Sequence, residues 1–299
     1  MRERYALYRE CAETEHYANY NWFDRPQWTE ACAVVDSLLL AIELWRATGE
    51  AEYLTTAHHV YFNALSYAQR PNGGFGCDLC PGADGRIHLG PHPEIFEAPW
   101  CCSMRGAEGL VRAAQAGMMI EGAKRTVWQA FYFEGETTLR LPDGEAVVRV
   151  TSEYPHAGSA TWTVVSSTLK SPVTWSFFVP PGVVASALVL NTPEPKPARM
   201  ESARFVSVPL MLSSGATWTV TMPLNVTAER PGNPSRWIGY NRFACGPLLL
   251  GAEDTTEGTV ALSPEESFQR AMTLSSRPGA GPGRCTTQRP LPCAARYRK

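Results

Sequence analysis

The chain carries nine cysteines, and the way they cluster suggests chemistry rather than cross-linking. Six of them precede residue 103. Four of these six form a CxxC motif, Cys77 and Cys80, and an adjacent pair, Cys101 and Cys102. A small secreted scaffold would use such residues in disulfides, but a chain of 299 residues with 44% hydrophobic residues can build a core without them. The clustering therefore indicates metal or thiol chemistry, with buried free thiols as the alternative.

One carboxylate and three thiols make a suitable tetrahedral ligand set for zinc, namely Glu30, Cys32, Cys101 and Cys102. Thiolates select zinc over magnesium or calcium, and the metal in turn favours their deprotonated form. Residues i and i+2 of a regular helix point about 200° apart, so Glu30 and Cys32 can share a metal only where a helix begins. The segment Asp24-Arg25-Pro26 is a helix-initiation signal just upstream. Two helix N-termini facing one site would also favour thiolates.

The elements that must position these residues are helical before residue 125. One apolar stripe has helical spacing and is followed by Gly49 as a C-cap; it consists of Val34, Leu38, Ile42 and Trp45. A second helix is predicted over residues 51–67, ending before the breaker Pro71-Asn72-Gly73-Gly74. A third is predicted over residues 104–116. Between the last two lies a loop over residues 71–102, rich in Gly, Pro and Cys, whose length indicates a functional segment.

After residue 125 the apolar residues alternate with period two, which is typical of strands. The predicted strands are separated by Gly and Pro turns and cover residues 137–141, 146–150, 160–165, 173–179, 184–190, 205–210, 217–224 and 247–250. Such short strands without intervening helices predict an antiparallel β-sandwich over residues 125–274. Residues 275–299 hold six Arg or Lys and no acid. They are predicted to be a disordered basic tail, most simply a solvated end.

Bulk properties exclude several classes of protein. The formal net charge of −2 gives no overall attraction to nucleic acid or to an acidic membrane, so neither is expected as a partner. No apolar run approaches the roughly 20 residues that a bilayer-spanning helix needs. The first residues are charged and lead into no apolar segment, so no signal peptide is expected in this chain. A cytoplasmic location is favoured on this basis, although the true N-terminus is expected to lie upstream.

At the cysteine-bearing segments, the sequence resembles glycoside hydrolase family 127, which includes β-L-arabinofuranosidases and was once grouped as DUF1680. The matching segments follow one another in the same order as in that family: Thr29-Glu30-Ala31-Cys32-Ala33, Tyr61-Phe62-Asn63-Ala64-Leu65, Trp100-Cys101-Cys102, Val150-Thr151-Ser152-Glu153-Tyr154-Pro155 with Gly158, and Phe243-Ala244-Cys245-Gly246-Pro247-Leu248 with Glu253. The resemblance covers roughly residues 10 to 255.

The resemblance implies a fold and a reaction. In that family an (α/α)6 barrel of six helical hairpins precedes a β-sandwich, so residues 1–124 would be the C-terminal part of the barrel, holding its last few helices. The implied zinc ligands are Glu30, Cys32, Cys101 and Cys102, and Cys101 is also the implied nucleophile. The implied activity is that of a hydrolase, a retaining glycosidase acting on an arabinofuranoside or related carbohydrate, with Zn²⁺ as cofactor.

The resemblance leaves two candidates for the general acid/base. The resemblance places a glutamate about sixteen residues before Glu30, where Thr14 stands between Glu13 and Glu15. Glu15 is the first candidate and Glu13 the second, with surface carboxylates as the alternative. Aromatic and amide side chains that sugar sites use follow nearby, and with His92 from the later loop they form the candidate substrate contacts: His16, Tyr17, Asn19 and Trp22.

Three further points stay open at the level of sequence. Cys77 and Cys80 match no ligand of the family; structural thiols are favoured over a second metal site, a supporting role or a redox pair. His88 and His92 are exposed loop histidines, substrate contacts or ligands, and His58 is expected in the core. Because part of a barrel is missing, the chain is expected to expose apolar stripes, to be a possible homodimer and to be poorly active alone. The alternative function is an inactive zinc-stabilised structural or carbohydrate-binding remnant; a cysteine protease or thiol oxidoreductase has little support.

Overall fold

The computed structural model describes residues 28–70, 72–79, 90–91, 101–192, 199–202, 204–229 and 242–250. They fall into two compact units. The helical unit contains the described residues up to Arg112 and those from Val226 onward, and the β unit contains those from Ala113 to Asn225. The division therefore falls about a dozen residues before the expected change near residue 125. The expected basic tail, residues 275–299, lies outside the described residues.

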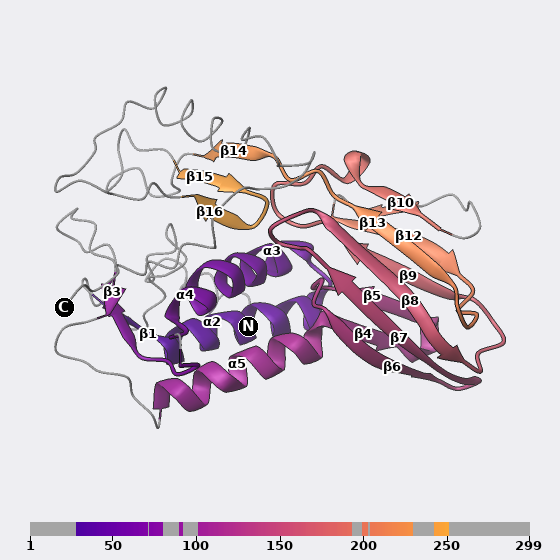
Figure 1. Cartoon of the computed structure of the whole chain (residues 1–299), viewed down its shortest axis with the longest axis horizontal. Helices are drawn as coiled ribbons and strands as arrows, with labels where there is room; N and C mark the ends of the chain where they lie inside the picture. Colours follow the sequence, from indigo (N-terminus) through magenta and orange to yellow (C-terminus); the bar gives the residue numbers. More distant parts are fainter. Residues whose placement is uncertain are drawn as a thin grey trace. The chain divides into compact units, whose positions relative to one another are not determined.

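The helical unit begins with consecutive helical segments (Figure 1). Helix α2 (Ala31–Thr48) ends at Gly49, whose φ of 73° and bond to the Trp45 carbonyl make the predicted C-cap. Helix α3 (Ala51–His59) continues into a π-helical segment, η2 (Val60–Leu65), and a short last turn, α4 (Ser66–Ala68). The predicted stripe on α2 is buried, and the predicted helix over residues 51–67 is confirmed. The π-helical turn within it was not predicted.

Helix α5 (Cys101–Gly117) begins three residues before its predicted start, and its residues up to Arg112 belong to the helical unit. It runs in the same direction as α2. Arg105 of α5 pairs with Asp36 of α2, and two turns further along both helices Arg112 approaches Glu43 at 3.7 Å. Because both pairs keep the same offset in sequence, the N-termini of α2 and α5 lie at the same end of the unit.

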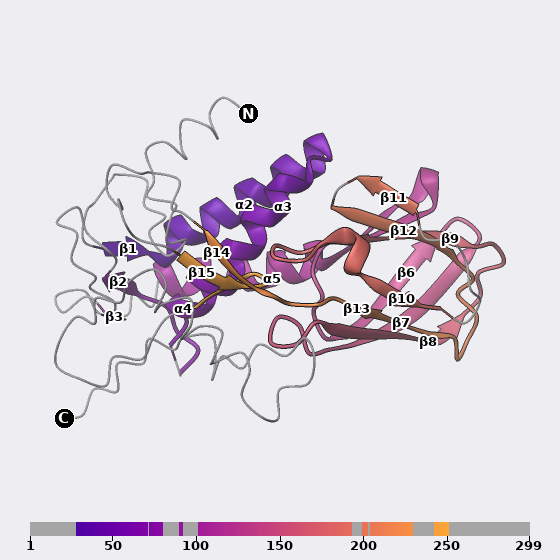
Figure 2. The same ribbon diagram turned by 90° about the horizontal axis from the view of Figure 1, so that it is seen from above.

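Two small antiparallel sheets complete the helical unit. The first has the order β1 (Trp28–Glu30), β2 (Cys77–Leu79) and β3 (Gly90–Pro91), with β1 and β2 side by side in Figure 2. The second contains β14 (Val226–Glu229), β15 (Arg242–Cys245) and β16 (Leu248–Leu250). The predicted strand at residues 247–250 therefore exists, but it pairs outside the sandwich to which it was assigned.

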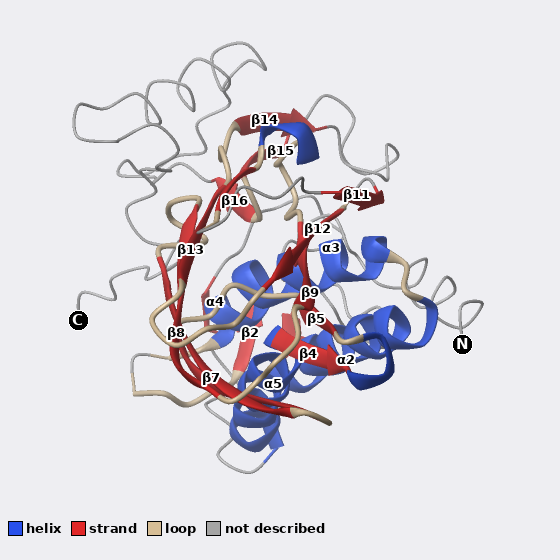
Figure 3. Cartoon of the chain, turned by 90° about the vertical axis from the view of Figure 1, so that its right-hand side faces the viewer, coloured by secondary structure: helices blue, strands red, loops and turns tan. Residues whose placement is uncertain are grey.

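The β unit is a sandwich of two five-stranded sheets, visible as two layers in Figure 3. The first sheet has the order β10 (Val189–Asn191), β13 (Thr217–Thr221), β8 (Ser159–Ser167), β7 (Gly144–Ser152) and β6 (Gly135–Leu141). The second has the order β11 (Arg199–Ser202), β12 (Phe205–Leu210), β9 (Val173–Phe178), β5 (Thr126–Gln129) and β4 (Met118–Glu121).

Two details of the sandwich differ from the sequence expectation. Strands β5 and β9 pair in parallel, so the sandwich is not purely antiparallel. The chain returns beside β5 only after building β6, β7 and β8 in the other sheet, and this long crossover permits the parallel pair. The predicted strand over residues 184–190 is instead a 3-10 turn, η4 (Ala185–Ala187), followed by β10.

Tryptophans from both sheets fill the interior of the sandwich. Trp162 of β8 stacks on Trp218 of β13 with ring centroids 6.2 Å apart, and Trp175 of β9 contacts both from the opposite sheet. All three are buried. Buried Gln129 accepts a hydrogen bond from the Trp162 indole at 3.0 Å and donates to the carbonyls of Gly117 and Phe131. The predicted order, helices and then a sandwich, is confirmed by this architecture. Among the described residues, no helix has both the length and the hydropathy for crossing a bilayer.

Candidate metal-thiolate site

Three cysteine sulfurs meet where α2 and α5 begin. Cys32 is the second residue of α2, and Cys101 and Cys102 are the first two of α5. The Sγ atom of Cys102 lies 3.7 Å from that of Cys32 and 3.8 Å from that of Cys101, and all three sulfurs lie within 4.8 Å of one another. The predicted convergence of these three residues, far apart in sequence, is confirmed.

The spacing of the sulfurs fits metal ligation better than cross-linking. A disulfide would bring two sulfurs to about 2.05 Å, and none of the three cysteines takes part in one. Thiolates bound tetrahedrally to zinc at about 2.3 Å lie about 3.8 Å from each other. Two of the three spacings match this value, so the arrangement needs little adjustment to hold such an ion.

The electrostatics of the cluster are compatible with a bound cation. The pKa of Cys32 is raised well above its usual range by its hydrogen bond to the Cys102 sulfur, by burial, and by the negative charges that Cys102 and Cys101 would carry. Three thiolates this close repel one another, so without a positive ion the cluster keeps protons. The N-termini of α2 and α5 lie at the same end and supply part of the positive potential. A bound cation would supply the rest.

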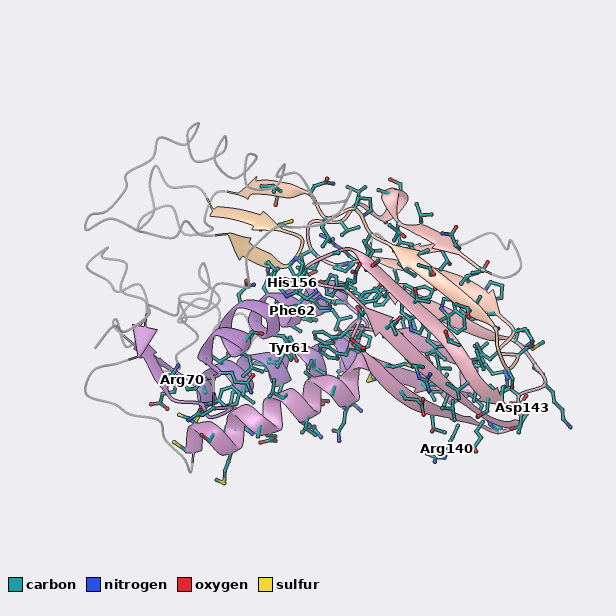
Figure 4. The ribbon with its side chains drawn as sticks, viewed as in Figure 1. Tyr61, Phe62, Arg70, Arg140, Asp143 and His156 are labelled. Atoms are coloured by element: carbon teal, nitrogen blue, oxygen red, sulfur yellow. The ribbon has the colours of Figure 1, made fainter. Side chains whose placement is uncertain are left out.

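A hydrogen-bonded turn leads from α4 toward the cluster. Arg70, labelled in Figure 4, donates its backbone N–H to the carbonyl of Gly74 at 2.8 Å, and Gly73 has a φ of 85°. After this turn, Phe75 exchanges two hydrogen bonds with the Ser103 hydroxyl, which accepts from the Phe75 N–H at 3.1 Å and donates to its carbonyl at 3.3 Å. Ser103 directly follows Cys102, so this contact fixes the turn beside the first turn of α5.

Small residues allow α5 to approach its neighbours closely. A Cβ added to Gly106 would lie 2.3 Å from the Phe75 ring, and one added to Gly109 would lie 2.7 Å from Val35 of α2. The Arg105–Asp36 ion pair adds a polar link between the same two helices. These contacts set the distance between the helix that carries Cys32 and the helix that carries the other two cysteines.

Two of the matching sequence segments contact each other in the helical unit. Asn63 of η2 donates to the carbonyl of Pro247, in the β15–β16 turn, at 2.8 Å and to the carbonyl of His59 at 2.9 Å. The Nδ1 atom of buried His59 lies 3.3 Å from the same Pro247 carbonyl, which assigns the proton to Nδ1. Figure 4 shows Tyr61 and Phe62 on the same segment. This polar contact was missed from the sequence, because its residues are 184 positions apart. The sequence feature that could have indicated this contact is Asn63, an amide side chain within an otherwise apolar helical segment.

The remaining predicted site residues have different outcomes. Glu30 ends β1 in an extended conformation immediately before α2, and its carboxylate is not part of the three-sulfur group. Its role as a ligand stays a prediction. His58, expected in the core, is fully buried and packs edge-on against Phe62. Other predicted positions lie outside the described residues: Glu13, Glu15, His16, Tyr17, Asn19, Trp22, Cys80, His88 and His92.

Comparison with known proteins gives matches at the level of structure. No family model matches the sequence, and no curated protein does. A solved structure described as a glycoside hydrolase aligns with a TM-score of 0.60 and 18% identity, over 74% of this chain and 37% of its own. Ara127N, a GH127 β-L-arabinofuranosidase from Geobacillus stearothermophilus T6, aligns with a TM-score of 0.56 and 11% identity, over 74% and 36%. BT3674, a GH127 β-arabinofuranosidase, aligns with a TM-score of 0.55 and 13% identity, over 77% and 38%.

The chain shares its fold with the C-terminal portion of GH127 glycoside hydrolases. At these identities the likeness is one of fold. The chain spans little more than a third of the length of each of these solved structures. The sequence resemblance to GH127 depends on a few short segments. The structural match covers about three quarters of the chain and supports the same likeness.

Proposed function

We propose that the chain is the C-terminal part of a retaining, zinc-dependent glycoside hydrolase of the β-L-arabinofuranosidase type. The observation that carries the proposal is the convergence of the Cys32, Cys101 and Cys102 sulfurs at 3.7 and 3.8 Å, on a fold shared with GH127 enzymes. The fourth ligand is Glu30, and the helices around it are the last few of an (α/α)6 barrel. A carbohydrate with an L-arabinofuranosyl or related sugar is the substrate.

Cys101 has the exposure that a nucleophile needs. It is exposed, whereas Cys102 is 1% exposed and buried behind it. Zinc bound at this cluster would supply the positive charge that holds the sulfurs as thiolates at neutral pH. Cys101 is the most exposed of the three cysteines, so its sulfur is the proposed nucleophile. All three sulfurs serve as ligands.

The chemistry divides into two displacements. The Cys101 thiolate attacks the anomeric carbon while a carboxylic acid, for which Glu15 is the first candidate, protonates the departing glycosidic oxygen. The product of this step is a thioglycoside on Cys101. The carboxylate then takes a proton from water, the water oxygen bonds to the anomeric carbon, and the carbon–sulfur bond breaks to return the thiolate. Two inversions give net retention. His16, Tyr17, Asn19, Trp22 and His92 are the proposed sugar contacts.

The test compares cysteine variants in the chain extended upstream in its genome. With nitrophenyl L-arabinofuranosides as probes, Cys101→Ser should lower turnover roughly 10³-fold or more, whereas Cys80→Ser should leave it unchanged. Zinc should be present in wild type and in Cys80→Ser, and NMR of the first product should show retained configuration. An inverted product, or full activity in Cys101→Ser, would overturn the proposal. Because the proposed barrel is incomplete in this chain alone, we expect little hydrolysis by it; robust activity would contradict that point.

A second candidate function has no catalysis. The chain covers only 36–38% of the length of the GH127 structures that it matches. A zinc-stabilised structural or carbohydrate-binding remnant would keep the sulfur cluster and lose turnover. Zinc binding with no hydrolysis in the extended chain, and with glycan binding that survives Cys101→Ser, would favour this alternative.

A further inference from the structure

The two parallel helices that carry the cysteines are also joined by ion pairs, and these pairs share a register with the sulfurs. Arg105 of α5 pairs with Asp36 of α2. Asp36 follows Cys32 by four residues, and Arg105 follows Cys101 by four residues. Four residues of helix rise about 6 Å, which is just over one turn. The ion pair therefore lies about one turn further along than the sulfurs, on the helix faces that carry Cys32 and Cys101.

The same register continues along both helices. A second ion pair, Arg112 with Glu43 at 3.7 Å, follows seven residues later on each helix. All three pairs, one of cysteines and two of opposite charges, have members that are 69 residues apart. Sliding α5 along α2 by one turn in either direction would set both arginines opposite uncharged residues: Cys32, Leu39, Leu40 and Ala47. Of these three registers, the observed one alone forms both charge pairs.

The packing of α5 leaves its register to the charges. Within the helical unit, the buried positions of α5 are Cys102, Gly106 and Gly109. None of them has a long or branched side chain that could lodge between residues of α2. A Cβ on Gly109 would come within 2.7 Å of Val35, so this glycine allows a close approach. Such a smooth surface fixes the distance between the two helices more firmly than it fixes their position along the axis.

Arg105 is oriented for its partner before the helices meet. Its Nη1 donates to the carboxylate of Glu108 on the same helix, and its Nη2 donates to that of Asp36 on α2. Because the guanidinium is a planar fork, the first bond aims the donor of the second. All three side chains are partly exposed, and ion pairs of this exposure contribute little to overall stability. Their effect is expected mainly on which arrangement of the helices forms.

The position along the axis matters most for one of the three sulfurs. Cys101 and Cys102 are neighbours on α5, so their spacing is set within one helix. Cys32 reaches them across the helix pair, and a slide of one turn, about 5.4 Å, exceeds the 4.8 Å within which all three sulfurs lie. We infer that Arg105 and Asp36 are positioning residues of the metal-thiolate centre, which keep Cys32 level with the other two sulfurs. The inference rests on the metal centre of the proposed function, but not on hydrolysis.

The experiment measures the zinc affinity of the full chain by competition with a chromophoric chelator. Arg105→Met removes the charge and keeps most of the side-chain length, and Asp36→Asn is nearly isosteric. Each should lower the association constant for zinc about 10-fold or more, as removal of residues that orient metal ligands does. Exchanging the charges, with Asp36→Arg and Arg105→Glu together, should recover most of this loss. Arg149→Met is the matched control, because it breaks a partly exposed ion pair with Glu136 in the β unit.

Cobalt substitution separates positioning from general stability. At saturating cobalt, the sulfur-to-cobalt charge-transfer band should have the intensity of three thiolates in wild type and in Arg149→Met. In Arg105→Met it should fall to that of two thiolates, because Cys32 no longer lies level with the pair on α5. Thermal unfolding of the metal-free proteins should differ little, as expected for partly exposed ion pairs.

The possible outcomes separate this inference from the proposed function. Wild-type zinc affinity in Arg105→Met and Asp36→Asn, an equal loss in Arg149→Met, or an exchanged variant no better than the single ones would overturn the inference. A wild type that binds no zinc would overturn both. Zinc affinity that responds as expected, with no hydrolysis by the extended chain, would overturn the proposed function alone. Hydrolysis together with unchanged zinc affinity in both single variants would overturn the inference alone.

Discussion

The Sγ atoms of Cys32 and Cys102 lie 3.7 Å apart although 70 residues separate them in sequence. Each stands in the first turn of its own helix, and the two helices are parallel. The pair is therefore a product of helix packing and does not depend on a local sequence motif. The stability of the helical unit and its zinc affinity should therefore respond both to metal and to changes in the packing of the two helices.

The cluster should make stability depend on pH in opposite ways with and without metal. The pKa of Cys32 is raised in the folded, metal-free protein by Cys102, burial and Cys101. The unfolded chain therefore releases this proton first as pH rises past the usual cysteine value of about 8.5. Metal-free protein should thus be stable below that pH and lose stability above it. Bound zinc should reverse the trend by holding the thiolate form.

Thermal unfolding at pH 7 and pH 10, with zinc and with EDTA, measures this effect. Cys32→Ser is the control, since it removes the titrating group. If the metal-free wild type and Cys32→Ser lose stability equally between the two pH values, the cluster does not govern the pH dependence.

Gly106→Ala should destabilise the helical unit and weaken metal binding. The new Cβ would lie 2.3 Å from the Phe75 ring, so the ring or the helix must move; overpacking of this kind costs about 1–3 kcal/mol. Urea denaturation measures the free energy of unfolding, and chelator competition measures zinc affinity. Gly122→Ala is the matched control, because its Cβ would meet nothing within 4 Å. Equal stability of the two variants would contradict the proposed close contact.

Gln129→Leu should destabilise the β unit. The substitution removes the acceptor of the buried Trp162 indole and one donor to the Phe131 carbonyl, and a buried polar group left unsatisfied costs about 1–3 kcal/mol. The Gly117 carbonyl keeps the N–H groups of Ala130 and Phe131. Near-UV circular dichroism would follow the tryptophan cluster during urea unfolding. Gln115→Leu, on the exposed side of α5, should change stability by no more than about 0.5 kcal/mol. Comparable losses in both variants would argue against this polar network.

The choice between Glu15 and Glu13 as general acid/base has a kinetic test. Replacing the true acid/base by Gly in the extended chain should slow hydrolysis of alkyl arabinofuranosides far more than that of nitrophenyl substrates, because a good leaving group needs no proton. Added azide should then restore turnover by attacking the thioglycoside. We expect this pattern for Glu15→Gly. If Glu13→Gly shows it instead, the assignment moves by two residues; if neither does, both are surface carboxylates.

The sequence predicted the order of elements and the meeting of the three sulfurs well, because both depend on strong patterns. The helical stripe over Val34, Leu38 and Trp45 and the C-cap at Gly49 are local signals, and the helix follows them. Cys101 and Cys102 stand immediately before a periodic helical segment, so their place at a helix N-terminus could be predicted. That Cys32 meets them came from chemistry and from the resemblance, and the packing of α2 and α5 confirmed it.

What the sequence did not predict depends on pairing between distant residues. The strand at Leu248–Leu250 was predicted, but the sheet to which it belongs was not. Alternation of apolar and polar residues indicates that a strand exists, but it does not indicate which strands pair with it. The parallel pairing of β5 with β9 and the contact of Asn63 with Pro247 also join residues that are distant in sequence, so neither was predicted. The pairing that sets Cys77 opposite Glu30 likewise becomes visible only in the strand register.

The two stretches that form the helical unit have a consequence for the order of events during synthesis. The helices up to Arg112 leave the ribosome first, and the hairpin that carries Pro247 follows only after the entire β unit. At about 5–20 residues per second, the carbonyl that His59 and Asn63 bind is made roughly 10 to 40 seconds after they are. The nascent helices must meanwhile keep these polar groups hydrated, so the helical unit is completed last although its first helix is made first.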